Sequence, residues 1–95
     1  MDIRNLLCLS IQRALLGEIS PFLRAVVFSY ISKEIEVRFY FDGVIKEEDL
    51  ESVSYIETQV IADYDVVYTV SAICKRLDFP DPIIDQGIWV YYRRE

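Results

Sequence analysis

The sequence predicts an α+β fold, a two-layer sandwich in which two helices cover one face of a four-stranded, mainly antiparallel sheet. Three patterns predict it: apolar residues at three- and four-residue spacing near the N-terminus, strict apolar/polar alternation over residues 34–41, and a second helical stripe between residues 47 and 64. The expected order is helix, strand, strand, helix, strand, strand. We expect residues 1–95 to form one domain, because this length suffices for a single core.

The first helix is expected over residues 3–16, with Asp2 as its N-terminal cap and Gly17 as its stop. Six apolar residues recur on one face of this helix: Ile3, Leu6, Leu7, Ile11, Ala14 and Leu15. This face should pack against the sheet.

Two strands are expected next. A turn at Ser20 and Pro21 leads into residues 22–30, and the second strand covers residues 34–41. In the second strand the apolar residues are Ile35, Val37, Phe39 and Phe41, each separated by a polar residue or tyrosine. The short polar break at residues 32–33 predicts a hairpin between these strands.

The second helix is expected over residues 47–64, where an apolar stripe is formed by Leu50, Val53, Ile56 and Val60. A β-branched segment at residues 66–77 predicts the third strand, and residues 80–82 (Pro-Asp-Pro) predict a loop. The last strand is expected over residues 88–93, after Gly87.

We expect the four strands to pair as two hairpin-like units, which leaves the sheet face away from the helices partly exposed. That face should present Glu34, Glu36, Arg38 and Tyr40. The last strand should add either Trp89, Tyr91 and Arg93 or Ile88, Val90 and Tyr92.

The negative charge is concentrated on one segment, residues 42–65. It holds one base, Lys46, and eight acids: Asp42, Glu47, Glu48, Asp49, Glu51, Glu57, Asp63 and Asp65. The segment therefore carries −7 and the other residues carry +1, which gives the net charge of −6. One interpretation is a solvated helix face, in which acids of the first turn are stabilised by the helix dipole. The other is a surface that binds a basic protein partner.

Several classes of function are disfavoured by the composition. The absence of histidine removes the commonest general base and every Ser-His or Cys-His pair, so we do not expect an enzyme. No spacing predicts a metal site, a cofactor or a disulfide between Cys8 and Cys74. An isoelectric point near 4.6 disfavours nucleic acid and anionic membranes as partners. Arg4, Gln12 and Arg13 interrupt the N-terminal apolar residues, so we expect a cytoplasmic protein.

Five stretches along the chain together resemble a family of small bacterial proteins. They are RALLGEISP (13–21), RFYFDG (38–43), IETQVIADY (56–64), RLDFPDP (76–82) and WVYYRRE (89–95). The family consists of immunity proteins of polymorphic or contact-dependent growth inhibition toxin systems. The resemblance implies a protein that binds a cognate toxin domain stoichiometrically, and immunity proteins to nuclease toxins are often acidic.

On this interpretation the candidate partner-binding residues are six acids and two aromatic residues: Asp42, Glu47, Glu48, Asp49, Glu51, Glu57, Trp89 and Tyr91. The carboxylates would mimic nucleic-acid phosphates, and the aromatic side chains would act as apolar anchors. The alternative is a non-enzymatic adaptor or homo-oligomer, such as a homodimer, in which the exposed sheet face or the last strand pairs between chains.

Overall fold

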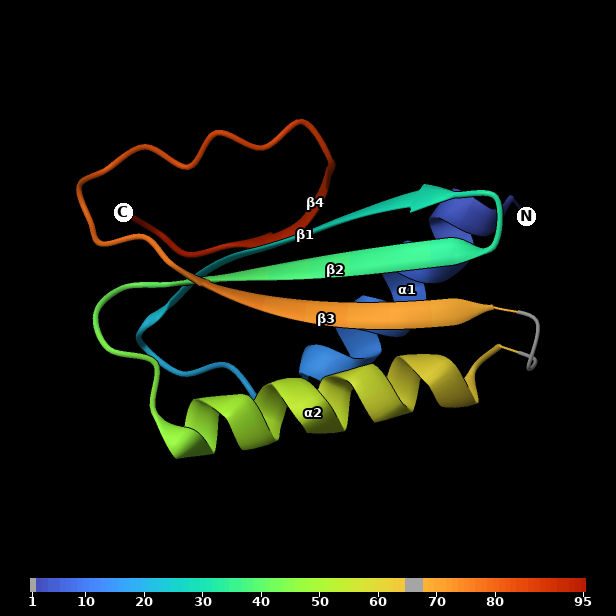
Figure 1. Ribbon diagram of the computed structural model, residues 1–95, viewed down its shortest axis with the longest axis horizontal. Helices are drawn as coiled ribbons and strands as arrows, with labels where there is room; N and C mark the ends of the chain where they lie inside the picture. The colour runs from blue at the N-terminus through green and yellow to red at the C-terminus, as the bar shows by residue number, and fades with distance from the viewer. Residues whose placement is uncertain (1, 65–67) are drawn as a thin grey trace.

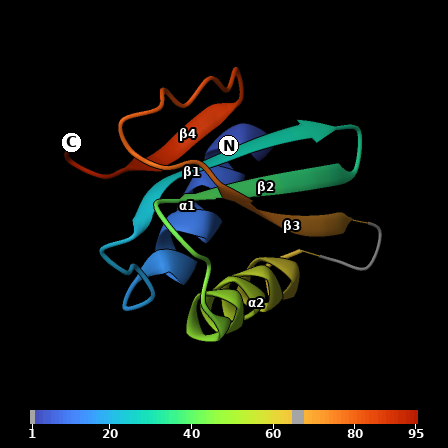
Figure 2. The same cartoon turned by 60° about the vertical axis from the view of Figure 1, so that its left-hand side comes forward.

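Two helices pack on one face of a four-stranded sheet in the computed structural model, which describes residues 2–64 and 68–95 (Figures 1 and 2). In chain order the elements are α1 (Ile3–Leu15), β1 (Leu23–Ile31), β2 (Glu34–Phe41), α2 (Glu47–Ala62), β3 (Thr69–Arg76) and β4 (Ile88–Tyr92). The predicted α+β class and element order are confirmed. Residues 66 and 67, where the third strand was expected to begin, lie outside the described residues.

The ends of α1 form as the sequence predicts. The Asp2 carboxylate accepts a hydrogen bond from the backbone N–H of Asn5 at 3.0 Å, which satisfies one of the free amides of the first turn. Beyond the helix Gly17 has a φ of +80°, a left-handed conformation that glycine adopts without steric strain. The chain can therefore turn sharply from α1 toward β1.

The sheet order is β3-β2-β1-β4, and it differs from the expected pair of hairpins. β1 pairs antiparallel with both β2 and β4, whereas β2 and β3 are parallel. The helix α2 carries the chain back along the sheet, so that β3 starts at the same end as β2. Consequently β3 and β4 lie at opposite edges and do not pair.

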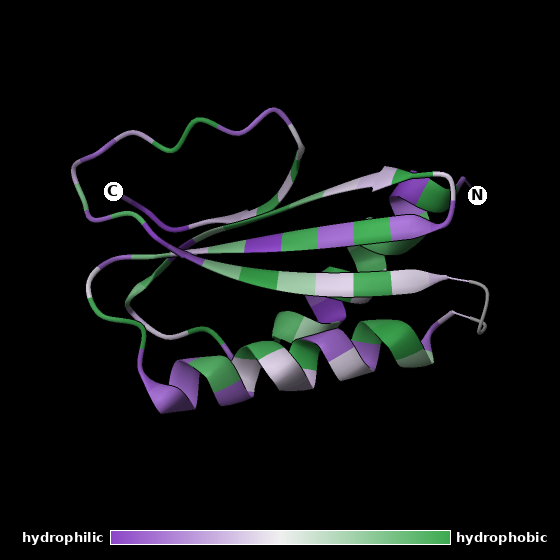
Figure 3. Cartoon of the chain, viewed as in Figure 1, coloured by the Kyte–Doolittle hydropathy of each residue, from purple (hydrophilic) through white to green (hydrophobic). Residues whose placement is uncertain are grey.

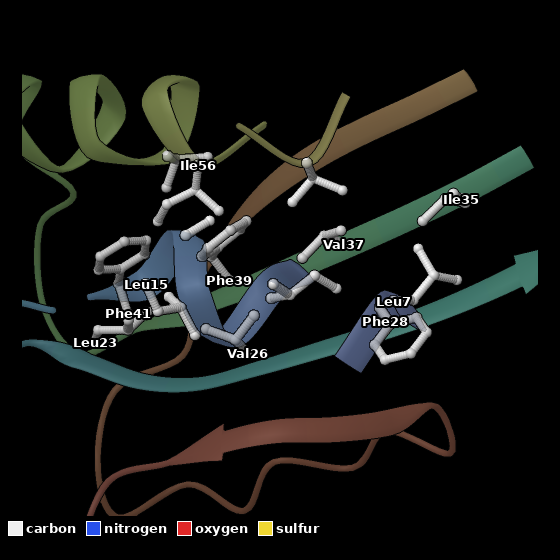
Figure 4. Packing of buried hydrophobic residues seen from close by; sticks show 14 residues of the cluster. Leu7, Leu15, Leu23, Val26, Phe28, Ile35, Val37, Phe39, Phe41 and Ile56 are labelled. Carbon is white, nitrogen blue, oxygen red and sulfur yellow. The ribbon is translucent and has the colours of Figure 1, made fainter. Parts of the chain in front are cut away.

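The main core lies between the helices and the sheet (Figure 4). There, α1 contributes Leu7 and Ile11, and α2 contributes Val53, Ile56 and Val60. The strands add the alternate residues that point toward the helices, among them Phe28, Ile35, Val37, Phe39 and Phe41. The alternation of β2 is visible as changing hydropathy along the strand in Figure 3. Leu50, expected in the helical stripe, is instead half exposed.

The other sheet face is less exposed than the sequence suggested. Ala25, Val27 and Tyr40 form a second apolar cluster there, against which Leu77 and Ile83 from the connection between β3 and β4 are packed. Arg38 and Tyr40, expected to be presented to solvent, are accordingly buried. A connection that returns over the sheet cannot be recognised from strand periodicity.

A β-bulge in the pairing of β1 with β4 decides which residues of the last strand share this face. Val26 is opposite Tyr91, but the next residue, Val27, is opposite Trp89, so that Val90 is the extra residue. Tyr91 therefore packs toward the helix-facing core. Neither expected set of alternating residues occurs, because the bulge interrupts the alternation.

Candidate functional site

Three of the six predicted partner-binding acids are engaged within the fold. The Asp42 carboxylate accepts hydrogen bonds from the Arg93 guanidinium at 3.0 Å and from the backbone N–H of Phe79 at 3.2 Å. These bonds hold the end of β2 against the segments on either side of β4. We infer that Asp42 supports the fold rather than being available to a partner.

Asp49 and Glu57 also bind backbone amides. Asp49 is 6% exposed, and its carboxylate accepts a hydrogen bond from the backbone N–H of Lys46 at 3.0 Å, at the N-terminus of α2. The Glu57 carboxylate accepts from the backbone N–H of Ala72 at 2.8 Å. Because Ala72 lies in the edge strand β3, this bond caps an amide that would otherwise face outward.

The remaining three acids, Glu47, Glu48 and Glu51, are exposed on the first two turns of α2. Together with the half-buried Glu18 they form what we call the acidic corner. None of these four carboxylates makes an ion pair within residues 2–64 and 68–95. Of the six acids predicted to bind a partner, these three are exposed at the surface, and their role in binding stays a prediction.

Two shallow depressions hollow the acidic corner. One, of about 410 Å³, is lined by Lys46, Glu47, Glu48 and Glu51. The other, of about 300 Å³, lies between α2 and the loop at residues 17–22, and its lining includes Glu18, Phe22, Lys46 and Glu48. Since Lys46 and Glu48 line both, the two depressions adjoin.

Exposed apolar side chains surround this corner. Five of them come from the loop that follows α1 and from the chain around the start of α2, and they are 44–76% exposed: Leu16, Ile19, Phe22, Val44 and Leu50. An exposed surface that combines apolar groups with charge is typical of protein interfaces. Sequence reasoning missed Leu16, Ile19 and Phe22 because they precede the acidic segment, and Leu50 because it was assigned to the core. Val44 lies within the segment but in no expected helix or strand.

The one base of the acidic segment is held in this corner. The Lys46 ammonium lies over the Phe22 ring, 4.9 Å from the ring centroid. This is a cation–π contact between residues that are far apart in the sequence. It joins the loop after α1 to the N-terminus of α2.

The two predicted aromatic anchors lie elsewhere and face opposite ways. Trp89 is 37% exposed, donates its indole N–H to the backbone carbonyl of Asp85 at 3.1 Å, and packs edge-on against Tyr92. Tyr91 packs toward the helix-facing core. Trp89 lines neither depression of the acidic corner. Its strand, β4, lies at the sheet edge opposite β3. The structure does not bring the predicted acids and aromatic residues together.

A second group of charged residues, which we call the ion-pair network, was not identified from the sequence. Arg24 binds Glu95 through two hydrogen bonds of 2.8 and 3.0 Å, and both side chains are almost fully buried. Arg38 likewise binds Asp85 at 2.7 and 3.0 Å. The network also includes the pair of Arg93 and Asp42.

These contacts shift the ionisation of the buried carboxyls. Hydrogen bonds from Arg38, opposed by burial, lower the pKa of Asp85 to about 2. Those from Arg24 similarly lower the pKa of Glu95 to about 2. Burial, and then the hydrogen bond to Asp85 at 2.7 Å, raise the pKa of Tyr40 to about 12. Asp85 and Glu95 are thus charged at neutral pH, and each is neutralised by its arginine.

No group of three or more acidic, cysteine or histidine side chains in the described part of the chain is placed to hold a metal ion. Cys8 and Cys74 are unpaired thiols, and burial raises the pKa of Cys74. None of the described helices is both long enough and apolar enough to cross a membrane. The surface of the described residues offers charge and apolar contact at the acidic corner.

Comparison with known proteins identifies one family. The model of the family described as MafI2 immunity protein matches residues 4–95, almost the whole chain. A search of curated proteins found no match. The family resemblance found in the sequence is confirmed.

Proposed function

The chain belongs to the MafI2 immunity protein family, and we propose that it neutralises a cognate toxin by stoichiometric binding through the acidic corner. The family supports immunity against a toxin and hence a toxin as partner. The acidic corner as the binding surface, the absence of catalysis and the chemistry of the toxin are our proposals. Two unpaired cysteines fit a reducing compartment, so we place the encounter in the cytoplasm.

One observation carries the choice of surface: Glu47, Glu48 and Glu51 are exposed and unpaired among the described residues, whereas Asp42, Asp85 and Glu95 are bound to arginines. Uncompensated carboxylates on one corner attract a basic protein and accelerate its association. The exposed apolar residues beside them, such as Ile19 and Phe22, supply contact area that charges alone do not provide.

A basic nuclease is the toxin class that best fits this surface. A nuclease binds a polyanion in a cleft lined by lysine and arginine, and carboxylates on a helix can occupy the places of the phosphates. The first two turns of α2 present three such carboxylates on a rigid element. We propose that α2 blocks the nucleic-acid cleft of the toxin.

The experiment that tests this proposal is reversal of two exposed acids, Glu48→Lys with Glu51→Lys. The partner is the toxin domain encoded in the neighbouring reading frame, purified in a catalytically inactive form. We expect the association rate constant to fall at least about tenfold at low salt, and less at high salt, because steering by charge is screened. In cells producing the active toxin, the variant should protect growth poorly.

The matched control reverses two exposed acids outside the acidic corner, Glu34→Lys with Asp81→Lys. It makes the same change in net charge and should slow association much less. Equal association by both double variants and the unmodified chain would remove the acidic corner from the mechanism. Failure of the unmodified chain to bind the toxin domain would refute stoichiometric neutralisation.

A self-associating module is the second candidate function. Of the two sheet edges, β4 is the one better suited to pair with a second copy. The outer edge of β3 has an amide capped by Glu57, while β4 carries the exposed Trp89 and Tyr92. Pairing of β4 between two copies would form a continuous sheet. Sedimentation velocity over a hundredfold range of concentration tests this: a concentration-dependent dimer supports it, and a monomer throughout rejects it.

A further inference from the structure

We propose that Phe22, Glu18 and Glu48 form a receptor for one arginine side chain of the toxin, and that Lys46 occupies this receptor in the free protein. The proposal rests on the toxin-binding function proposed above and specifies how part of the surface works. It assigns a role to the 300 Å³ depression between α2 and the loop at residues 17–22.

The depression combines the three features that bind a guanidinium group. Phe22 is 46% exposed and offers a ring face, and the Lys46 contact at 4.9 Å shows that this face is accessible to a cation. Glu18 and Glu48 line the same depression and can accept charge-assisted hydrogen bonds. Its volume equals that of roughly ten water molecules, enough for the end of a long side chain.

Lys46 is the N-cap residue of α2, and a different residue type there would stabilise the helix more. It precedes the first residue of α2, where serine, threonine, asparagine and aspartate are favoured because their side chains cap the helix. A positive charge is also unfavourable at a helix N-terminus. The cap is supplied instead by Asp49. Departures from local rules of this kind cluster at functional sites.

In the free protein Lys46 covers an exposed aromatic ring and offsets repulsion among the neighbouring carboxylates. An ammonium group is strongly hydrated and sits on a flexible stem, so it can leave the ring for solvent without rearrangement of the backbone. An incoming guanidinium stacks on the ring and reaches carboxylates through its planar fork of donors. Displacement of Lys46 by the toxin arginine follows from this difference.

The first test is nuclear magnetic resonance of the isotopically labelled chain, free and saturated with the inactive toxin domain. In the free chain, the ring current of Phe22 should shift the ε-methylene protons of Lys46 upfield, and Phe22→Leu should abolish the shift. In the complex, the signal should move to the position typical of a solvated lysine. An upfield shift that persists in the saturated complex would overturn the displacement.

The second test compares dissociation constants. Phe22→Leu keeps an apolar side chain without the ring face and should weaken binding about two- to fivefold. Lys46→Gln removes the internal occupant and should tighten binding about two- to fivefold. Lys33→Gln is the matched control, because it removes the same charge from the exposed turn between β1 and β2.

The outcomes separate the receptor from the proposed function. The receptor is overturned if Phe22→Leu binds as tightly as the unmodified chain and Lys46→Gln binds as tightly as Lys33→Gln. The acidic corner still stands in that case, provided that Glu48→Lys with Glu51→Lys weakens binding. Absence of binding by the unmodified chain would remove both. Opposite effects of Phe22→Leu and Lys46→Gln, with Lys33→Gln near neutral, would establish the receptor.

Discussion

The acidic corner and the ion-pair network use the same side-chain chemistry in opposite ways. In the network the side chains of Asp85 and Glu95 are 6% and 9% exposed and are bound by arginines. In the acidic corner Glu47, Glu48 and Glu51 are exposed and have no such partner within the described residues. A carboxylate paired inside the fold contributes to its stability, whereas an unpaired one on the surface remains available to a binding partner.

Local charge density in a sequence therefore does not identify the acids that can bind a partner. Asp85, outside the acidic segment, is bound by Arg38, and Asp42, within the segment, is bound by Arg93. Whether an arginine is nearby depends on strand pairing and on the path of the connection between β3 and β4. Variants of the two groups should therefore differ in how much they change the free energy of unfolding.

The largest effect is expected for Asp85→Ala. Arg38, whose side chain is 11% exposed, would retain only Glu36 and Ser29 as partners, and the connection before β4 would lose its main anchor. Glu36 is 46% exposed in its side chain and would compensate the buried Arg38 charge only in part, so we expect a loss of about 3 kcal/mol, measured by urea unfolding. Asp81→Ala, an exposed acid of the same connection, should change stability by less than about 0.5 kcal/mol. Equal losses would contradict the distinction.

A smaller loss, about 2 kcal/mol, is expected for Gly87→Ala. A β-carbon on Gly87 would lie 2.5 Å from Nη2 of Arg38 and 2.7 Å from the carbonyl oxygen of Phe28. Because Asp85 holds the guanidinium in place, Arg38 cannot simply move away. Thermal unfolding measures the loss, with Gln86→Ala as the neighbouring control. An unchanged melting temperature would mean that Arg38 is less firmly fixed than its contacts indicate.

Acid should weaken the network selectively. The folded-state pKa of Asp85, about 2, is below the ordinary value of 3.8, so its contribution is complete above that ordinary value and is lost as pH falls toward 2. Between pH 5 and pH 3 this group alone should cost about 1 kcal/mol of unfolding free energy. Asp85→Asn should show a correspondingly shallower decline over this range in urea unfolding. Parallel declines in both proteins would contradict the assignment.

The smallest effect on stability is expected for the double reversal Glu48→Lys with Glu51→Lys. Both side chains are exposed and unpaired among the described residues, and relief of repulsion is offset by placing lysines near the N-terminus of a helix. The free energy of unfolding should change by less than about 0.5 kcal/mol in the assay used for Asp85→Ala. A loss comparable to that of Asp85→Ala would show that these acids also support the fold.

Much of the fold was predictable because it depends on local patterns. The strand over residues 34–41, the Asp2 cap and most of the stripe of α1 follow from which side chains can be buried, and the structure confirms them. Leu6, expected in that stripe, is instead 43% exposed. The parallel pairing of β2 with β3 was not predicted, because strand periodicity is the same for parallel and antiparallel neighbours and the helix expected between the two strands was not interpreted as a crossover. The bulge at Val90 likewise leaves no signature in the alternation of a five-residue strand.

The candidate site was predictable in its charge and not in its extent. The acidic N-terminus of α2 was identified, but Asp49 and Glu57, named with it, bind backbone amides. Phe22 was assigned to a strand, and its contact with Lys46 depends on how the loop after α1 packs beside α2. Such a contact joins residues that are distant in sequence, and only packing creates it.

Residue type and spacing were sufficient to predict the α+β class, the order of the elements, the excess of negative charge on one segment and the family to which the chain belongs. The tertiary structure alone decided which carboxylates meet arginines and which stay unpaired, because an ion pair requires two side chains to be brought within about 4 Å by separate elements. That geometry, rather than acidity, distinguishes the surface proposed to bind a toxin.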